Sequence, residues 1–286
     1  MADDPVLLRE ATSWGVRLTL NRPAKLNALS AELRDALTEA IVDAAADDAV
    51  RVIAIAGSGR AFCAGYDLSE AAPPTAWQWR DVLERDVRAT LAIWSCQKPV
   101  IAQVHGYALA GGLELAMACD LVVAAEDAQL GEPEIRFGSA PVTLLMPFVI
   151  GQKKTRELLL TGDLIDAAEA ERIGLVNRVV PADRLAAEVD ALADRLARVP
   201  PDVMAPTKLM LNRAMDAAGF AAAVEMGLDL QAFVNMSETA REFDAIVRAD
   251  GLKAALAWRD RRYDERLAGS GTRAGPPSDR TSDPTP

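Results

Sequence analysis

Two glutamates stand twenty residues apart near the middle of the chain, and a glycine-bearing segment precedes each of them. Glu114 lies in the run Gly-Gly-Leu-Glu-Leu-Ala, and Glu134 lies in the run Glu-Pro-Glu-Ile. A pair of carboxyl groups can exchange protons with a substrate, and backbone N–H groups at a turn can stabilise a negative charge that develops during a reaction. The pair therefore predicts an acid/base site. The alternatives are that Glu114 is a solvated helix residue and that Glu134 caps the turn that Pro133 begins.

The elements that must position these glutamates follow from the hydrophobic pattern. Turn residues between two alternating runs predict a strand pair at 6–10 and 16–20. A helix capped by Ser30 comes next, and a further helix runs from the Gly111-Gly112 turn through Ala118. Apolar runs that end in loops predict buried strands at 51–56, 100–104 and 121–124. This order favours an α/β core over an all-α bundle.

Helical patterns dominate the second half of the chain. Helices are predicted at 153–160, 167–173 and 183–197, with one strand at 176–180. After Pro200-Pro201 further helices are predicted to about residue 267, and they include a long apolar-periodic stretch at 220–247. The last twenty residues are polar and rich in proline, which predicts a disordered tail.

Composition removes several classes of protein. The chain has 286 residues, 50% of them hydrophobic, so it can bury a full core as one large domain or as one domain with an appendage. A formal net charge of −11 argues against a surface that binds nucleic acid or an anionic membrane. The acidic start has no apolar stretch, and no later run approaches the roughly 18 apolar residues of a membrane helix. We therefore expect a soluble, cytoplasmic protein.

Cysteine and histidine are scarce in the sequence. The three cysteines, Cys63, Cys96 and Cys119, form no pattern typical of a disulfide framework or a zinc site, and we interpret Cys63 and Cys119 as small core residues. The single histidine, His105, follows a predicted buried strand and is interpreted as structural. A site that needs two imidazole ligands is excluded, and no metal is expected.

Several motifs in a fixed order carry a resemblance to a known family. They are Leu20-Asn21-Arg22-Pro23, Leu26-Asn27-Ala28-Leu29, Ala61-Phe62-Cys63-Ala64-Gly65-Tyr66-Asp67-Leu68, Lys98-Pro99-Val100-Ile101-Ala102, the run from Gly106 to Ala116, Cys119-Asp120, Pro133-Glu134-Ile135, Leu160-Thr161-Gly162-Asp163 and Gly174-Leu175-Val176. Over about residues 16–181 this set resembles the crotonase superfamily, the enoyl-CoA hydratase and isomerase family.

The resemblance implies an α/β fold built as a crotonase-type spiral of ββα units, with a C-terminal helical region that forms trimers. We accordingly divide the chain into a spiral core (1–200), a helical oligomerisation region (201–267) and the tail (268–286). The family acts on acyl-CoA thioesters as homotrimers or homohexamers. Coenzyme A is then part of the substrate, and no separate cofactor is expected.

The resemblance also implies a role for each residue of the site. The backbone N–H groups of Tyr66 and Gly111 form an oxyanion hole for the thioester oxygen, where negative charge develops when water adds to an α,β-unsaturated thioester. Glu114 helps to activate the water for attack at the β carbon, and Glu134 exchanges the proton of the α carbon. Many relatives with other reactions have lost one of the two glutamates. The pair therefore favours hydration or dehydration over isomerisation, decarboxylation or thioester hydrolysis.

Contacts to the CoA phosphates depart from the family pattern. Relatives often carry a lysine just after the first glycine loop, where this chain has Ser69, and another in the C-terminal helix, where it has Trp258-Arg259. The substrate-binding candidates are Arg22, Lys25, Arg60, Arg259, Ala64, Asp67 and Leu68. Basic residues at such places are also typical of surface charges, and Asp67 alternatively organises its own loop through backbone hydrogen bonds.

Three features bear on the acyl group. The segment 138–147 has bulkier residues than the glycine-rich loop of many hydratases, and Tyr66 stands where a small residue is common. Both are expected to reshape the acyl pocket. The cluster Trp77-Gln78-Trp79 precedes a predicted helix, where relatives place a variable lid, and ordinary core packing is the alternative.

We therefore predict an enoyl-CoA hydratase, which adds water reversibly to a trans-2-enoyl-CoA to give a 3-hydroxyacyl-CoA. Rivals on the same fold are an enoyl-CoA isomerase, a carnitinyl-CoA-type hydratase and a hydrolase, and product analysis separates them. A rival of another class is a non-catalytic RNA-binding relative, against which the acidic charge and the intact pair of glutamates argue.

Overall fold

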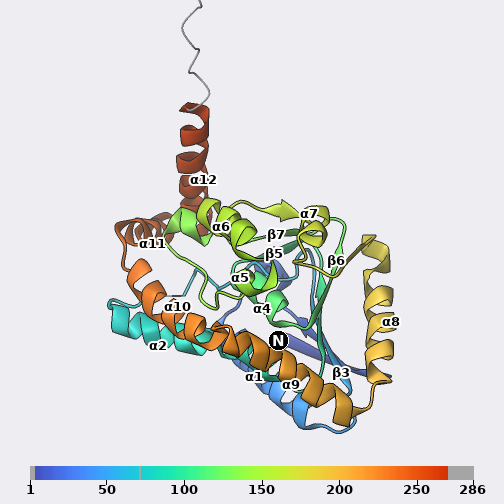
Figure 1. The fold of residues 1–286 in the computed structure, drawn as a ribbon. Coiled ribbons are helices and arrows are strands. Elements are labelled where there is room, and N and C mark those ends of the chain that lie inside the picture. Colours follow the sequence, from blue (N-terminus) through green and yellow to red (C-terminus); the bar gives the residue numbers. More distant parts are fainter. Residues whose placement is uncertain (1–3, 71, 270–286) are drawn as a thin grey trace, which may run out of the picture.

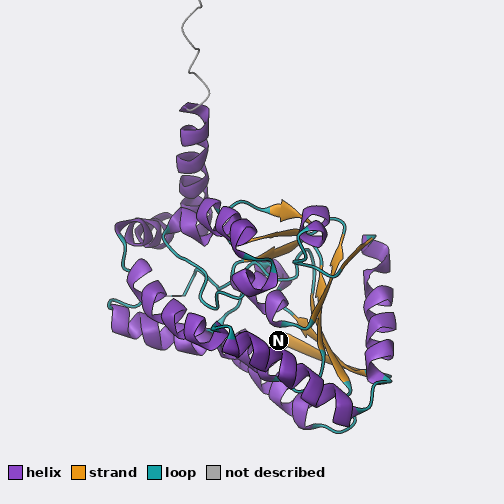
Figure 2. Ribbon diagram, viewed as in Figure 1, coloured by secondary structure: helices purple, strands orange, loops and turns teal. Residues whose placement is uncertain are grey.

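Two β-sheets lie at the centre of the fold, and helices surround them (Figures 1 and 2). The computed structural model describes residues 4–70 and 72–269. The larger sheet has the strand order β1 (Leu7–Thr12), β2 (Gly15–Leu20), β3 (Val52–Gly57), β4 (Val100–Val104), β6 (Leu121–Ala125) and β9 (Arg178–Val180). The smaller sheet has the order β5 (Tyr107–Leu109), β7 (Gln129–Gly131) and β8 (Ile165–Asp166).

The larger sheet is antiparallel only at its first edge. β1 and β2 form a hairpin in which Leu7 faces Leu20, whereas the remaining neighbours pair in parallel. The inner strands β3 and β4 are buried along nearly their whole length, which explains why their sequences are continuous apolar runs. The three predicted buried strands are confirmed to within one residue, and the predicted hairpin is confirmed with bounds shifted by up to two residues.

Twelve helices are described, together with three short 3-10 turns. The helices are α1 (Ala31–Ala46), α2 (Ala76–Asp86), α3 (Arg88–Ser95), α4 (Gly111–Ala118), α5 (Met146–Val149), α6 (Gln152–Thr161), α7 (Ala167–Arg172), α8 (Leu185–Ala197), α9 (Pro201–Ala217), α10 (Phe220–Val234), α11 (Glu238–Asp250) and α12 (Leu252–Gly269). The 3-10 turns are η1 (Pro23–Lys25), η2 (Pro133–Phe137) and η3 (Ala182–Arg184). α1 begins where predicted, because the Ser30 hydroxyl accepts a hydrogen bond from the Leu33 N–H at 3.3 Å.

Side chains pack on both faces of the larger sheet. On one face, Leu18 and Ile55 belong to the main core, which also contains the buried positions of α1 and α4. On the other face, Val52 and Ile101 pack with Val189 of α8, which Figure 1 shows alone on that side of the sheet. The mixed α/β fold predicted from the sequence is thus confirmed.

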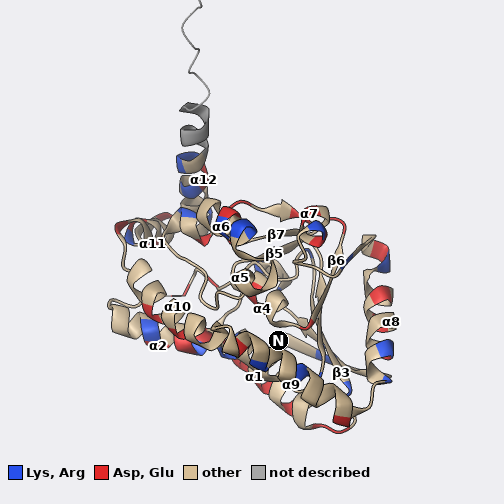
Figure 3. Ribbon diagram, in the orientation of Figure 1, with Lys and Arg blue, Asp and Glu red and all other residues tan. Residues whose placement is uncertain are grey.

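Charged residues are concentrated on the outer helices. Figure 3 shows Lys and Arg interleaved with Asp and Glu along α8 and α12, while the central helices carry few charges. α5 has no charged residue, and α4 has one, Glu114, although every residue of α4 is buried. A buried carboxyl group in an otherwise apolar helix is unusual in a protein core, so Glu114 is a candidate for a functional role.

The C-terminal region is helical as predicted, and the apolar-periodic stretch at 220–247 is divided between two helices. α10 ends at Val234, and α11 begins after Ser237, whose hydroxyl accepts a hydrogen bond from the Ala240 N–H at 3.2 Å. Hydrophobic spacing alone does not detect this break, because the apolar period continues across the capping residue. The predicted tail lies outside the described residues from 270 on, and α12 includes its first two residues.

In the described part of the chain, no single helix has the length and hydropathy to cross a membrane. α9 and α10, which bend by 58° at their junction, pass that test of length and composition only as a pair. α10 buries Phe220, Val224 and Leu228 in the main core, as amphipathic helices of folded domains do.

The helix predicted after Trp79 begins before Trp77, and several short strands were not predicted. α2 and α3 fill residues 76–95, so Trp77 and Trp79 lie inside a helix and not before one. Trp77 is 84% exposed, whereas Trp79 packs against the main core. β5, β7 and β8 have three residues or fewer, too few for an alternating pattern to appear. β9 covers 178–180 of the predicted 176–180.

Candidate active site

The loop after β3 and the start of α4 lie against each other. Gly65 adopts a φ of +95°, and a Cβ atom there would lie 2.6 Å from the Ala110 Cβ and 3.4 Å from the Gly111 nitrogen. Only glycine allows this approach. A β-bridge between Leu29 and Tyr66 fixes the end of the loop. Tyr66 and Gly111, the two predicted oxyanion-hole residues, are therefore neighbours in space.

Both predicted N–H donors are free of backbone partners. Within residues 4–70 and 72–269, the N–H groups of Tyr66 and Gly111 donate to no backbone carbonyl. Gly111 is the first residue of α4, whose first turn closes when the Leu113 and Glu114 N–H groups donate to the Ala110 carbonyl at 2.8 and 3.0 Å. The N-terminus of a helix presents unpaired N–H groups and a partial positive charge. The two N–H groups can therefore bind an oxygen atom that carries negative charge.

The aromatic ring of Tyr66 lies directly against Gly111. A Cβ atom on Gly111 would come within 2.6–2.9 Å of three atoms of the ring, so a larger residue does not fit there. The Tyr66 hydroxyl is buried and has no hydrogen-bond partner among the described residues. Burial, and then the charges of Glu114 and Asp86, raise the pKa of this phenol well above its usual value. Tyr66 thus fills the space beside the oxyanion hole and leaves one polar atom unsatisfied.

Glu114 is held by a loop of the segment 138–147. Its side chain is 1% exposed, and its Oε1 atom accepts hydrogen bonds from the Val142 N–H (2.8 Å), the Thr143 N–H (2.7 Å) and the Thr143 hydroxyl (2.9 Å). Its Oε2 atom is buried and has no hydrogen-bond partner in the described part of the chain. Burial raises the pKa of Glu114, and the bonds from Thr143 and Val142 oppose that rise without cancelling it. One oxygen is thus anchored, and the other is available to water or substrate.

Glu134 is buried with far fewer partners. It lies in η2 and is 7% exposed, and its Oε2 atom has no hydrogen-bond partner within residues 4–70 and 72–269. Burial raises the pKa of Glu134 to about 8, and the nearby charge of Glu114 adds to the rise. A carboxyl group in this environment holds a proton at neutral pH. The alternative roles are not found, because Glu114 is not solvated and η2 has no side-chain cap.

Glu132 is a third buried carboxyl group that the sequence reasoning missed. It precedes η2, is 2% exposed, and has a buried Oε2 atom without a partner. Burial, then the charges of Glu134 and Glu114, raise its pKa well above the usual range. A signal was present in the sequence, since Glu132 and Glu134 flank one proline.

The segment 138–147 positions Glu114, a role that was not predicted from its sequence. Besides holding Glu114 through Val142 and Thr143, it is supported by α10. A Cβ atom on Gly227 of α10 would lie 2.2 Å from the Val142 carbonyl oxygen, and the Gln231 amide donates to the Ser139 hydroxyl. The helical region after residue 200 therefore contacts the loop that positions Glu114.

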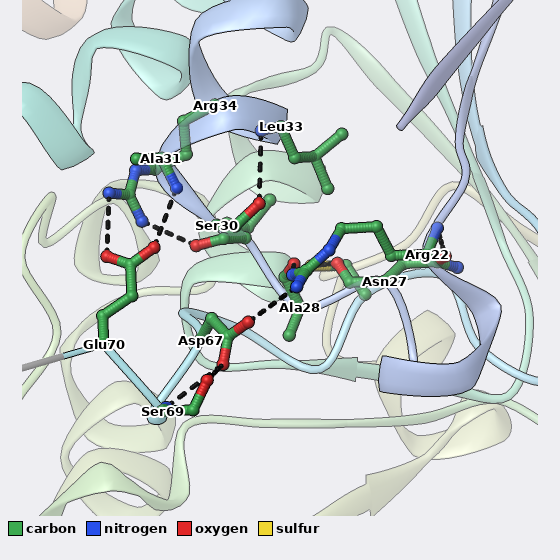
Figure 4. Close-up of polar contacts among 12 residues, drawn as sticks. Arg22, Asn27, Ala28, Ser30, Ala31, Leu33, Arg34, Asp67, Ser69 and Glu70 are labelled. Atoms are coloured by element: carbon green, nitrogen blue, oxygen red, sulfur yellow. Dashed lines mark hydrogen bonds and ion pairs between the residues drawn. The ribbon is translucent and has the colours of Figure 1, made fainter. Parts of the chain in front are cut away.

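Ion pairs stabilise the loop that contains Gly65 and Asp67, as Figure 4 shows. Arg22 donates to the Asp67 carboxylate at 2.8 Å and to the Ala28 carbonyl, and Asp67 accepts from the Ser69 N–H at 3.1 Å. Burial raises the pKa of Asp67, but the bonds from Ser69 and Arg22 outweigh burial and lower it overall. Asp67 thus organises its loop, which is the alternative the sequence offered. The Arg22 guanidinium is thus engaged by the Asp67 carboxylate and the Ala28 carbonyl.

The other substrate-binding candidates differ in whether their groups already bind another part of the protein. Lys25 and Arg60 are exposed and form no ion pair with the described residues. Arg259 pairs with Asp260 at 2.7 Å. Leu68 packs against the small cluster of Phe137, Phe243 and Ala255, and Ala64 donates its N–H to the Leu26 carbonyl. Lys25 and Arg60 are therefore the candidates with a free cation.

The cysteines and the histidine lie where the sequence predicted. Cys63 and Cys119 are buried, with exposed fractions of 0% and 7%, and all three cysteines are free thiols. The His105 ring lies 3.0 Å from the Gly59 carbonyl, a contact that supports a structural role. A cavity of about 350 Å³ between α3, α9 and α10 is lined by neither glutamate of the pair.

Comparison with known proteins agrees with this geometry. The model of the enoyl-CoA hydratase/isomerase family matches residues 14–247. A probable enoyl-CoA hydratase of Mycobacterium bovis is 39% identical over 222 residues, which cover 76% of this chain and 85% of that protein. A crotonyl-CoA hydratase of Syntrophomonas wolfei is 38% identical over 200 residues, which cover 68% of this chain and 76% of that protein.

A solved structure is similar over nearly the whole fold. The crystal structure of an enoyl-CoA hydratase/isomerase from Xanthobacter autotrophicus Py2 superposes with a TM-score of 0.87 at 40% identity, and covers 90% of this chain and 98% of that one. The match of the family model extends over well more than half of the sequence, and the solved structure shares its fold. The chain therefore belongs to the enoyl-CoA hydratase/isomerase family.

Proposed function

We propose that this protein is an enoyl-CoA hydratase that adds water reversibly to a trans-2-enoyl-CoA. One observation carries the proposal: two buried glutamates with unlike partners lie beside two unpaired backbone N–H groups. Hydration of a conjugated thioester needs a base for water, an acid for the α carbon and a site for the enolate oxygen. Membership of the family and the names of its relatives support the same reaction.

The thioester carbonyl binds between the N–H groups of Tyr66 and Gly111. As the oxygen gains negative charge in the transition state, these two donors and the N-terminus of α4 stabilise it. Because the donors are fixed before the substrate arrives, no reorganisation is needed during the reaction. The loss of one such donor typically lowers the rate by about 10²–10³-fold.

Glu114 acts as the base, and Glu134 acts as the acid. The free Oε2 of Glu114 takes a proton from water, whose oxygen forms a bond to the β carbon while the π electrons move toward the thioester oxygen. The O–H bond of Glu134 then breaks, and its proton forms the new C–H bond at the α carbon as the carbonyl reforms. The three hydrogen bonds on Glu114 favour its ionised form, and the burial of Glu134 favours its protonated form. The reverse steps give dehydration.

Lys25 and Arg60 are the proposed contacts of the CoA phosphates. Both are exposed, lie near the two loops of the site in sequence, and form no ion pair with the described residues. They replace the lysines that relatives use. The ring of Tyr66 beside Gly111 narrows the space for the acyl group next to the thioester.

The active assembly is a homotrimer or a homohexamer in the cytoplasm. Apolar side chains of α9 and α10 are exposed in the single chain: Leu209, Met210, Leu211, Met226, Leu230 and Phe233. An apolar surface of this kind is typical of an interface with another subunit. Sedimentation velocity of the purified protein tests this assembly.

A panel of straight, branched and aromatic trans-2-enoyl-CoA thioesters tests the proposed reaction. We expect the conjugated absorbance to fall and mass spectrometry to detect a product heavier by one water. The double variant Glu114→Gln with Glu134→Gln is the control and should be inactive. Turnover that only moves the double bond would support the isomerase instead, free CoA would support the hydrolase, and no turnover of any member would contradict the proposal.

A further inference from the structure

A buried arginine that the proposed reaction does not use lies close to Tyr66. Arg34 of α1 is 6% exposed, and arginine is almost never buried unless its charge is paired. Its guanidinium donates to the Leu29 carbonyl at 2.6 Å. It also pairs with the carboxylates of Asp86 in α2 at 3.0 Å and Glu70 at 3.4 Å, and Figure 4 shows it facing Glu70. These partners hold the guanidinium in one position.

Leu29 connects this guanidinium to the backbone of the glycine loop. Leu29 forms a β-bridge with Tyr66, its carbonyl accepts from the Asp67 N–H at 3.3 Å, and its own N–H donates to the Gly65 carbonyl at 2.8 Å. The Gly65 carbonyl and the Tyr66 N–H belong to one planar peptide group, in which they point in opposite directions. The bond from Leu29 to Gly65 therefore sets the direction of the Tyr66 N–H.

Arg34 acts on Tyr66 through the side chain as well. The guanidinium carbon lies 5.8 Å from the centre of the Tyr66 ring, within the range of a cation–π attraction. The same ring lies against Gly111, the other residue of the oxyanion hole. The alternative role of Arg34 is purely structural, since its ion pair with Asp86 joins α1 to α2.

We propose that Arg34 is a positioning residue of the hydration site: through the Leu29 carbonyl it fixes the Gly65–Tyr66 peptide so that the Tyr66 N–H points at the thioester oxygen. The proposal rests on the proposed function. Arg34 transfers no proton in this role. An oxyanion hole depends on donors that are already oriented when charge develops, so the loss of Arg34 should lower kcat more than it weakens substrate binding.

Two variants separate this role from the ion pair. Arg34→Met leaves the Asp86 carboxylate buried without its cation and should lower the melting temperature. The double variant Arg34→Met with Asp86→Leu removes both charges and should recover most of that loss. We expect kcat for hydration to fall about 30-fold in both variants, with KM within about threefold of the parent. Parental kcat in the stable double variant would overturn the proposal.

Arg17→Met is the matched control. Arg17 pairs with Asp190 at 2.6 Å and is also largely buried, with a side chain that is 15% exposed. It packs with Trp14 and α8, on the face of the larger sheet that is opposite the main core. Loss of this ion pair should leave kcat for hydration at the parental value, whereas a 30-fold fall would show that the effect of Arg34→Met is not specific to the oxyanion hole.

Exchange of the α protons of butyryl-CoA in D₂O provides a second readout. This exchange uses the oxyanion hole but adds no water to the substrate, so it should fall by about the same factor as hydration in both Arg34 variants. Exchange at the parental rate in the double variant would mean that the oxyanion hole is intact without Arg34, and the proposal would be wrong.

Infrared spectroscopy of bound butyryl-CoA, labelled with ¹³C at the thioester carbonyl, requires no turnover. Hydrogen bonds to the carbonyl lower its stretching frequency, so the band should shift on binding to the parent and to Arg17→Met, and shift less on binding to the double variant. An equal shift in the parent and the double variant would overturn the proposal. If the parent hydrates no enoyl-CoA, the proposed function fails, while the band shift still decides whether Arg34 orients the donors.

Discussion

Glu114 and Glu134 are the same residue type in the same site, yet their surroundings are opposite. Glu114 has one oxygen anchored by three hydrogen bonds from Val142 and Thr143, whereas Glu134 has a buried oxygen without a partner and lies beside a third carboxyl group. Donors lower the proton affinity of a carboxylate, and burial without donors raises it. The difference shows how two glutamates divide the work of base and acid.

The two environments also depend on different parts of the chain. Glu114 depends on the segment 138–147, which α10 supports through Gly227 and Gln231. Glu134 depends on η2 and on the end of β7. Changes in α10 should therefore affect Glu114 first. Because η2 packs against α11, with Phe137 stacked on Phe243 at 4.9 Å, changes in α11 should affect Glu134 first.

Replacing either glutamate should have the largest effect. Glu114→Gln and Glu134→Gln should each lower kcat for hydration by about 10²–10⁴-fold, because each removes a proton-transfer group. The two variants should differ in a second assay, the exchange of α protons of butyryl-CoA in D₂O, followed by NMR. This exchange needs the oxyanion hole and Glu134 only. Glu134→Gln should abolish it, and Glu114→Gln should keep it; equal loss in both variants would contradict the division of roles.

The free energy of unfolding should fall as pH rises, because Glu134 holds a proton in the folded state. The pKa of Glu134 is raised to about 8 in the folded state, against about 4.3 in an unfolded chain. Between these values the folded state binds the extra proton, so the free energy of unfolding of the parent falls as pH rises from about 4.3 to 8. Glu134→Gln has no such proton and should gain stability over the parent by about 2–4 kcal/mol at pH 8.

Thermal unfolding at pH 5 and pH 8 measures this difference. The gain in melting temperature of Glu134→Gln should be larger at pH 8 than at pH 5, and Glu114→Gln should not show the same gain, since it leaves Val142 and Thr143 facing an amide. A melting-temperature difference that does not change with pH would mean that Glu134 is ionised in the folded protein throughout this range.

Much of the fold was predictable because local signals agree with it. Continuous apolar runs identified the inner strands β3, β4 and β6, and the glycine pair located the start of α4. Elements without a local signal were missed, such as the short strands of the smaller sheet. The helix break at Ser237 was missed because the apolar spacing continues across it, and only the capping hydroxyl of Ser237 marks the start of the next helix.

The site was predictable only where backbone conformation requires a residue type. Gly65 and Gly111 are visible in a sequence, because close approach excludes side chains. The hydrogen bonds from Thr143 to Glu114 join residues that are far apart along the chain, and nothing in the local sequence signals them. Glu132 is visible in the sequence, but it was missed because Glu134 alone accounted for the Glu-Pro-Glu motif.

Thr143→Val tests the anchored glutamate directly. It removes the hydroxyl donor at 2.9 Å but keeps the shape and the backbone N–H. Because the bonds from Thr143 lower the pKa of Glu114, that pKa should rise, and the acid limb of the rate profile should move to higher pH. We expect kcat at pH 7 to fall about tenfold. Thr155→Val, which removes a buried hydroxyl in α6, is the matched control and should keep the parental profile.

Gln231→Leu should have the smallest effect of the series and the same sign as Thr143→Val. The Gln231 amide of α10 donates to Ser139 and is 3% exposed, so its loss loosens one contact of the segment that holds Glu114. We expect kcat to fall about threefold with a small shift of the acid limb to higher pH, and exchange of α protons at Glu134 to stay at the parental rate. A shift of the alkaline limb would instead show that α10 acts on both glutamates, and the separation of their supports would be lost.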